Sequence, residues 1–298
     1  MMKERIYRIA GHVVLLRFAD SHDAPALLPS YEPFALERIP DGEEPVLSVD
    51  IDDAWEFHPV GVEIGQFDCG GNMYDVAQLP GGDYQFVVHA GDGEVCCIMQ
   101  SDCSFHHCHV AVKATGKGLR SFGLNSCLMI AYAFSTVHKQ TLLVHASVIR
   151  REGRGYLMTA PSGTGKSTHT YLWYKNLPGC DLMNDDNPVV RIVDGHSVVY
   201  GSPWSGKTPC YRNVEAPIGA IVRIQQRKQN EIRPMGTAES LAVMLSQVSS
   251  MKWDRDIYHA VCATLGKLFA CTPMFELGCL PNAEAARLCY ETVSKAHV

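Results

Sequence analysis

The chain has 298 residues, of which 46% are hydrophobic and 19% charged, and its formal net charge at pH 7 is −6. These values are typical of a globular protein and allow one or two domains with buried cores. The negative charge argues against a nucleic-acid partner, which is bound mainly through its phosphates. No apolar run approaches the ~20 residues of a membrane span, so we expect no membrane partner.

The N-terminal residues and the cysteines predict the compartment. Residues 1–6 carry charges but no apolar run of the kind found in secretory signals. Most of the 12 cysteines lie within apolar runs, among them Cys127, Cys262 and Cys289, as is common for reduced, buried thiols. We therefore expect a cytoplasmic protein.

Residues 1–140 predict a β-rich module, because short apolar runs alternate with turn signals such as Pro-Gly-Gly-Asp at 80–83. We expect mostly antiparallel strands at 8–18, 45–51, 84–89 and 94–99. Residues 122–138 have the length and apolar spacing of a buried helix. We interpret the module as an accessory part that holds or selects the acceptor of a reaction.

One cluster in this module has the residue types of a zinc site, Cys-Ser-Phe-His-His-Cys-His at 103–109. A second pair of ligands is not evident in the sequence. The alternation of Cys108 and Val110 is instead typical of a half-buried strand. We favour the strand, and metal binding by residues from Cys103 to His109 stays open.

From residue 141 the pattern changes to mixed strands and helices and predicts an α/β domain that extends to residue 298. Strands are expected at 142–149, 156–159, 189–193 and 219–224. Helices are expected at 168–175, 237–251, 254–269 and 282–294. The predicted fold class is therefore α/β, with the β-rich module at 1–140 and the α/β domain at 141–298.

The strongest motif is Ala-Pro-Ser-Gly-Thr-Gly-Lys-Ser at 160–167, which fits the phosphate-binding loop (P-loop) pattern between a strand and a helix. Gly163 and Gly165 allow backbone N–H groups to turn inward around a phosphate at the helix N-terminus. Lys166 would reach the β- and γ-phosphates, and the Ser167 hydroxyl would bind Mg²⁺. We predict a nucleoside triphosphate site formed by Ser162, Gly163, Thr164, Gly165, Lys166, Ser167 and Thr168.

Three flanking segments extend this motif. His-Ala-Ser at 145–147 precedes the loop by one hairpin, Asn-Asp-Asp-Asn at 184–187 follows the loop helix, and Gly-Ser-Pro-Trp-Ser-Gly-Lys occupies 201–207. In this order the segments resemble the HPr kinase/phosphorylase family and, more distantly, the ATP-type phosphoenolpyruvate carboxykinases. The resemblance covers about residues 142–225, and residues 1–140 contain no matching motif.

The resemblance implies a P-loop nucleotide-binding core of that type and an ATP- and Mg²⁺-dependent kinase that phosphorylates a serine hydroxyl. It implies that His145 lies near the γ-phosphate, and that Asp185 and Asp186 supply a general base and a metal ligand. The chemistry agrees, because a hydroxyl needs a carboxylate to accept its proton and Mg²⁺ prefers oxygen ligands. We prefer Asp185 as base and Asp186, with Ser167, as metal ligand, and leave the reverse assignment open.

The resemblance leaves the acceptor and the assembly open. The acceptor would be a protein, a peptide or a small molecule that contains a serine-type hydroxyl. Members of the family form rings, so a homo-oligomer is one possible assembly.

The sequence departs from the family at two points. Thr168 stands where the bifunctional enzymes have glutamate, and their arginine-bearing loop is not recognisable. Lys207 would stabilise the transferring phosphoryl group in its place, with a plain surface lysine as the alternative. We expect the loop 203–207 to lie over the triphosphate, with Trp204 covering nucleotide or acceptor; the alternative buries Trp204 in the core. These departures argue against the reverse phosphorylase reaction.

Two other functions stay open. A nucleotide-dependent binding or regulatory module without phosphoryl transfer would be expected to lose catalytic positions, yet His145, Lys166, Ser167, Asp185 and Asp186 are all present. A phosphoenolpyruvate carboxykinase is disfavoured because those enzymes are far longer. It would also need a second cluster of arginines and lysines for its anionic substrate, and we identify none in the sequence.

Overall fold

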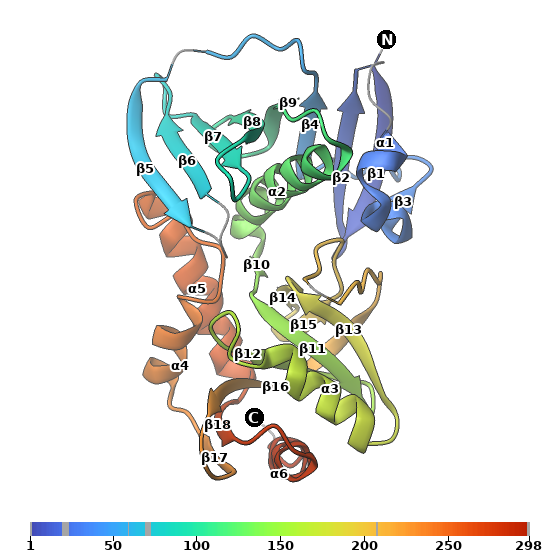
Figure 1. The fold of residues 1–298 in the computed structure, drawn as a ribbon, viewed down its shortest axis with the longest axis vertical. Helices are drawn as coiled ribbons and strands as arrows, with labels where there is room; N and C mark the ends of the chain where they lie inside the picture. Colours follow the sequence, from blue (N-terminus) through green and yellow to red (C-terminus); the bar gives the residue numbers. More distant parts are fainter. Residues whose placement is uncertain (1, 20–23, 59, 69–72, 207, 297–298) are drawn as a thin grey trace. The chain divides into compact units, whose positions relative to one another are not determined.

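The computed structural model describes residues 2–19, 24–58, 60–68, 73–206 and 208–296. The chain divides into two compact units, Met1–Thr136 and Val137–Val298, each built on its own sheet (Figure 1). The sequence analysis set this boundary after residue 140. Within the described ranges, no helix combines the length and the apolar character that crossing a bilayer requires.

The first unit is a mixed sheet with a long helix packed on it (Figure 1). Its strand order over the described residues is β3-β1-β2-β4-β9-β8-β7-β6-β5. The strands are β1 (Lys3–Ile9), β2 (His12–Phe18), β3 (Ala35–Leu36), β4 (Leu47–Ile51), β5 (Val62–Asp68), β6 (Met73–Gln78), β7 (Tyr84–His89), β8 (Val95–Ser101) and β9 (His107–Val112). The helices are α1 (Ala24–Leu27), η1 (Pro29–Phe34) and α2 (Lys117–Ser135), of which α2 packs on β7, β8 and β9.

Most elements predicted for this unit are confirmed, and one is wrong. The strands at 45–51, 84–89 and 94–99 correspond to β4, β7 and β8, and α2 covers most of the predicted helix. Residues 8–18, however, form a hairpin between β1 and β2 instead of one strand. Ala10 and Gly11 both have positive φ, 47° and 79°, which is the backbone of a tight hairpin turn. Apolar residues lie on both sides of this turn, so the sequence pattern does not indicate where the first strand ends.

The cysteine–histidine cluster lies in and just before β9. Cys108 is buried in the strand, whereas Cys103 is exposed. The His109 ring stacks on Trp55, with ring centroids 3.7 Å apart. In the part of the chain that the structure describes, no group of three or more His, Cys, Asp or Glu side chains is arranged to hold a metal ion.

The second unit is also built on a mixed sheet. Its path over the described residues is β10-β14-β15-β16-β12-β11-β13, with β18 paired to β16 and β17 paired to β18. The strands are β10 (Thr141–Leu143), β11 (Ala146–Arg151), β12 (Arg154–Thr159), β13 (Cys180–Asp186), β14 (Val189–Val193), β15 (His196–Tyr200), β16 (Glu215–Gln226), β17 (Glu231–Pro234) and β18 (Met274–Cys279). The helices are η2 (Val137–Lys139), α3 (Lys166–Asn176), α4 (Thr237–Met244), α5 (Arg255–Cys271) and α6 (Ala283–Val293).

One face of this sheet carries an apolar core. Met158, Val222 and Phe275 are neighbours on the parallel strands β12, β16 and β18. They are buried against α3 and α6, in a cluster that contains Trp173. This burial fixes α3 against the strand that precedes it.

The opposite face carries a row of polar side chains. Thr159, Arg223 and Glu276 are the next residues along the same three strands and are also neighbours in register. Since successive side chains of a strand point to opposite faces, this row lies on the face away from α3.

Two predicted elements of this unit end earlier than expected. The strand predicted at 142–149 is split into β10 and β11, with a break at Val144 and His145. The helix predicted at 237–251 stops at Met244. Both changes have one cause, because the chain around Gln247 leaves the helix and its carbonyl accepts a hydrogen bond from the His145 amide (2.7 Å).

Candidate active site

The segment between β12 and α3 forms a tight loop with the backbone that glycine permits. Gly163 and Gly165 have φ values of +76° and +113°, in the left-handed region that other residues rarely adopt. A Cβ atom at either position would meet nothing within 4 Å, so open space faces both glycines. Gln226 at the end of β16 donates to the Thr164 carbonyl (3.1 Å) and ties the loop to the neighbouring strand.

The predicted loop residues divide by exposure. Ser162, Gly163, Ser167 and Thr168 are exposed, whereas Lys166 is only 8% exposed. The Lys166 ammonium donates to the carbonyl of Ala160 (3.1 Å), so the side chain folds back across its own loop. Burial lowers the pKa of Lys166, and the nearby carboxylates of Asp186 and Asp185 act in the opposite direction.

His145 lies beside this lysine because of the break between β10 and β11. Its Nε2 atom is 2.9 Å from the Lys166 Nζ and 3.3 Å from Oδ1 of Asp186. Its backbone is held by Gln247, whose side-chain oxygen also accepts a hydrogen bond from Thr159 (3.2 Å). The three ionisable side chains therefore form a continuous line of contacts.

The two aspartates end β13 and have different surroundings. Asp185 is 3% exposed, and its Oδ1 accepts a hydrogen bond from the Ser167 hydroxyl (2.8 Å). Asp186 is more open, has a positive φ of 141° and contacts His145. Such a backbone is costly for a residue other than glycine and is common at functional sites. The two carboxylates thus have separate partners.

The loop after β15 borders the aspartates. Ser205 pairs with Asp186 in an isolated bridge, and the Gly206 amide donates to the carbonyl of Asp185 (2.5 Å). A Cβ at Gly206 would lie 3.1 Å from that of Asp186, so this position has room for little but glycine. Ser205 and Gly206 therefore lie next to the two aspartates, and the position of this loop over a triphosphate stays a prediction.

The role predicted for Trp204 is wrong. Its side chain is only 5% exposed, and its carbonyl accepts a hydrogen bond from the buried Asn184 amide (3.0 Å). The indole thus lies in the interior, where burial removes it from water, and cannot cover a ligand. Lys207 lies outside the described residues, and its role stays a prediction.

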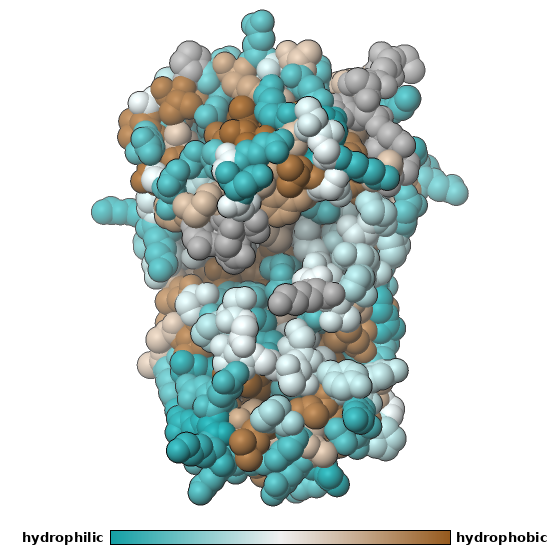
Figure 2. Space-filling view, in the orientation of Figure 1, coloured by the Kyte–Doolittle hydropathy of each residue, from teal (hydrophilic) through white to brown (hydrophobic). Residues whose placement is uncertain are grey.

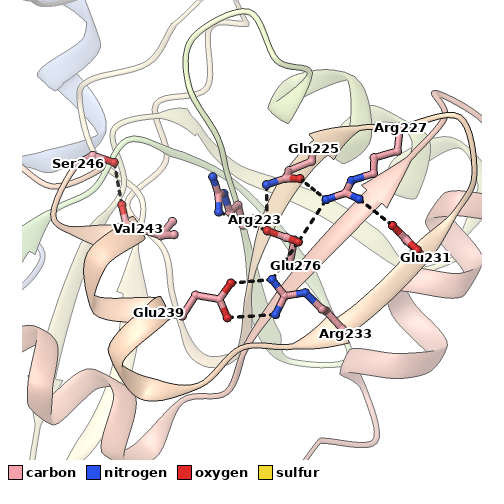
Figure 3. Close-up of polar contacts among 9 residues, drawn as sticks. All are labelled: Arg223, Gln225, Arg227, Glu231, Arg233, Glu239, Val243, Ser246 and Glu276. Carbon is pink, nitrogen blue, oxygen red and sulfur yellow. Dashed lines mark hydrogen bonds and ion pairs between the residues drawn. The ribbon is translucent and has the colours of Figure 1, made fainter.

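Sequence reasoning missed one group of side chains beside the loop. Arg223, Arg227 and Arg233 converge on the buried Glu276, at 3.2, 3.7 and 3.0 Å (Figure 3). This is a second cluster of basic residues near the P-loop motif, contrary to the sequence analysis. The arginines come from β16, the segment after it and β17, so only the pairing of these strands with β18 gathers them.

Comparison with known proteins adds little to this geometry. No known protein family matches the chain, and no curated protein matches it. Among solved structures, the chain is similar to the HPr(Ser) kinase/phosphatase from Coxiella burnetii, with 11% sequence identity and a TM-score of 0.30. The match covers 51% of this chain and 92% of that one. A TM-score this low carries no argument about fold or activity.

Proposed function

We propose that this protein is an ATP- and Mg²⁺-dependent kinase that transfers the γ-phosphoryl group to a serine-type hydroxyl. One observation carries the proposal. Lys166, His145 and Asp186 are joined by contacts of 2.9 and 3.3 Å directly beside a glycine loop that opens a helix. Phosphoryl transfer to a hydroxyl uses a cation beside the phosphates and a carboxylate that accepts the hydroxyl proton. Here an imidazole contacts both groups.

The loop has the properties of a phosphate site. The space facing Gly163 and Gly165 gives backbone N–H groups access to a ligand, and the N-terminus of α3 favours negative charge. The Lys166 ammonium donates to the Ala160 carbonyl and contacts His145, which leaves at least one N–H donor suited to phosphate oxygens. Its buried position strengthens this attraction, because charges interact more strongly away from water.

Ser167 and Asp185 have the chemistry of an Mg²⁺ site. Their oxygen atoms are 2.8 Å apart, and Mg²⁺ bound with ATP usually has few protein oxygen ligands besides phosphates and waters. Bound Mg²⁺ would supply positive charge that offsets the phosphate charge during transfer. These contacts favour Asp185 on the metal side, the reverse of the assignment preferred from sequence.

Asp186 is then the candidate base. In the proposed reaction the acceptor oxygen bonds to the γ-phosphorus as the bond to ADP breaks, and Asp186 takes the hydroxyl proton. The Nε2 atom of His145 contacts both this carboxylate and the Lys166 ammonium. According to its tautomer, it would accept from the ammonium or donate to the carboxylate, and so would position one of the two groups. The Gly206 backbone packs against Asp186 and restricts its movement.

The experiment is transfer of label from γ-labelled ATP to a panel of serine-containing proteins, peptides and small molecules. Lys166→Ala should reduce transfer at least a hundredfold, because the phosphates lose their buried cation. Lys175→Ala changes an exposed lysine on the same helix and should leave transfer within about twofold of the unchanged protein. Nucleotide binding without transfer to any acceptor would instead favour the binding-module alternative. Equal activity of both variants would refute the proposed site.

A further inference from the structure

A cavity of about 380 Å³ lies on the polar face of the second sheet, next to the candidate active site. Its apolar wall is formed by Ala160 and Pro161 at the start of the glycine loop and by Ala242 and Val243 of α4. Ligand pockets range from ~300 to 1,000 Å³. The cavity is at the lower end of this range and is suited to a small molecule rather than to a segment of a folded protein.

The cavity borders two residues that contact the reacting groups, although none of those groups is among its lining residues. The Ala160 carbonyl in its wall accepts the Lys166 hydrogen bond, and Gln247, also in its wall, holds the backbone of His145. A small molecule in this cavity would therefore lie next to the residues to which we assign phosphoryl transfer. The site fits an acceptor on the γ-phosphate side of the loop.

The polar lining carries one positive and one negative wall. Arg223 and Glu239 both line the cavity, and in Figure 3 they extend from β16 and α4 toward the same region. Two further groups connect them, because Arg233 contacts both Glu239 (2.6 Å) and Glu276 (3.0 Å), and Glu276 contacts Arg223 (3.2 Å). The two opposite charges are thus held at fixed positions within one network.

Arg223 retains capacity for a ligand. Among the described residues it donates one hydrogen bond to the protein, to Glu276, which leaves four of its five N–H donors for other partners. Glu276 is shared with Arg227 and Arg233, so it neutralises Arg223 only in part. A guanidinium binds a carboxylate or a phosphate in two-point geometry.

Glu239 offers the complementary charge. Its hydrogen bonds from Arg233 lower its pKa, so the group is a carboxylate at neutral pH. Each oxygen retains a lone pair for a second donor. A simple anion would be repelled by Glu239, and an uncharged nucleoside would use neither wall. The surface around β17 is largely hydrophilic, whereas that over α4 is mixed (Figure 2).

We propose that this cavity binds a free hydroxy-amino acid such as L-serine, with its α-carboxylate on Arg223 and its α-ammonium on Glu239. A free amino acid carries a carboxylate and an ammonium on its α-carbon, which matches a cavity with one positive and one negative wall. The cavity deepens the proposed kinase function, on which its role as an acceptor site rests. The amino acid hydroxyl would then point toward His145 and Lys166.

The test is calorimetric titration of the full chain with L-serine, with and without Mg·ATP-analogue. L-serine methyl ester lacks the carboxylate and N-acetyl-L-serine lacks the ammonium, and each should bind at least tenfold more weakly. Arg223→Gln should weaken L-serine binding at least tenfold but change ester binding less than twofold. Glu239→Gln should show the same pattern with the N-acetyl compound. The two variants test the two walls independently, and unfolding curves check that each is folded.

Arg227→Gln and Glu231→Gln are matched controls, because both residues belong to the same network without lining the cavity. Both should bind L-serine within about twofold of the unchanged protein.

Three results would overturn the inference: no saturable binding of L-serine, equal binding of the methyl ester, or an equal loss of L-serine binding in Arg227→Gln. If a peptide or protein is phosphorylated while L-serine does not bind, this inference fails and the kinase function stands. If L-serine binds as expected without any transfer, the cavity is supported and the kinase function fails.

Discussion

At the scale of single residues, the two adjacent aspartates of β13 provide the sharpest contrast in the site. Asp185 is buried and accepts a hydrogen bond from Ser167, whereas Asp186 is partly open and contacts His145. A carboxylate next to the serine is suited to a metal, and one beside the imidazole is suited to a proton. The contacts therefore separate two roles that neighbouring residues of one type leave ambiguous in sequence.

We predict that Asp186→Asn keeps Mg·ATP binding but lowers kcat by about 10²–10⁴, because an amide does not accept the hydroxyl proton. Asp185→Asn should instead raise the Mg²⁺ concentration needed for half-maximal activity at least tenfold, because one charged oxygen ligand is lost. Titrations of nucleotide and Mg²⁺ against both variants provide the measurement. The opposite pattern would restore Asp185 as the base.

A site residue can be predicted from the sequence when it belongs to a short motif, and not when its role depends on contacts with distant residues. The glycines and the lysine of the loop have a fixed spacing and occur between a strand and a helix, so their positions follow from a short segment. Gln247 accepts one hydrogen bond through its backbone carbonyl and one from Thr159 through its side-chain oxygen, and no sequence motif indicates either contact. The buried position of Trp204 was not predicted, and the contact of its backbone carbonyl with Asn184, twenty residues away, arises only in the folded chain.

At the scale of secondary structure, errors occur where tertiary contacts override the local pattern. The apolar run 142–149 reads as one strand, but Val144 pairs with Val248 and the run breaks. The apolar residues of 245–251 would be expected to continue α4. Their backbone instead forms hydrogen bonds with residues 143 and 145, where the predicted strand breaks. By contrast, α5 and α6 follow the capping residues Asp254 and Asn282, whose side chains accept backbone hydrogen bonds. Their prediction was therefore accurate.

The loop helix α3 carries a buried pH-sensitive group. His169 accepts a hydrogen bond from the Trp173 indole (3.1 Å), and burial lowers its pKa from 6.5 to about 4. The unfolded chain binds a proton below pH 6.5, whereas the folded chain binds it only near pH 4. Protonation thus favours unfolding. The stabilising contribution is complete above pH 6.5 and falls as the pH drops toward 4.

We predict that this histidine accounts for a loss of about 2 kcal/mol in the free energy of unfolding between pH 7.5 and pH 5. His169→Gln keeps an acceptor for the indole but does not titrate, so it should lose about 2 kcal/mol less over the same interval. Urea unfolding at both pH values measures the difference. The other acidic groups are common to both proteins and cancel in the comparison. Equal losses would show that His169 does not control this dependence.

At the scale of the whole molecule, the candidate site belongs to one unit. All of its described residues, from His145 to Glu276, lie within Val137–Val298. That unit has its own sheet and its own apolar core between the sheet, α3 and α6. The first unit also has its own sheet, and the role in acceptor selection predicted for it from sequence stays a prediction.

We predict that residues 137–298, produced alone, fold and bind Mg·ATP with a Kd within about fivefold of the full chain. The reason is that the loop, its helix and both aspartates are held by contacts within this unit. Fluorescence titration with a nucleotide analogue measures Kd, and the same fragment with Lys166→Ala controls for nonspecific binding. If the fragment 137–298 folds but does not bind nucleotide, while the full chain does, the prediction is contradicted. The nucleotide site would then require the first unit. Binding retained together with loss of transfer would instead assign the first unit to the acceptor step.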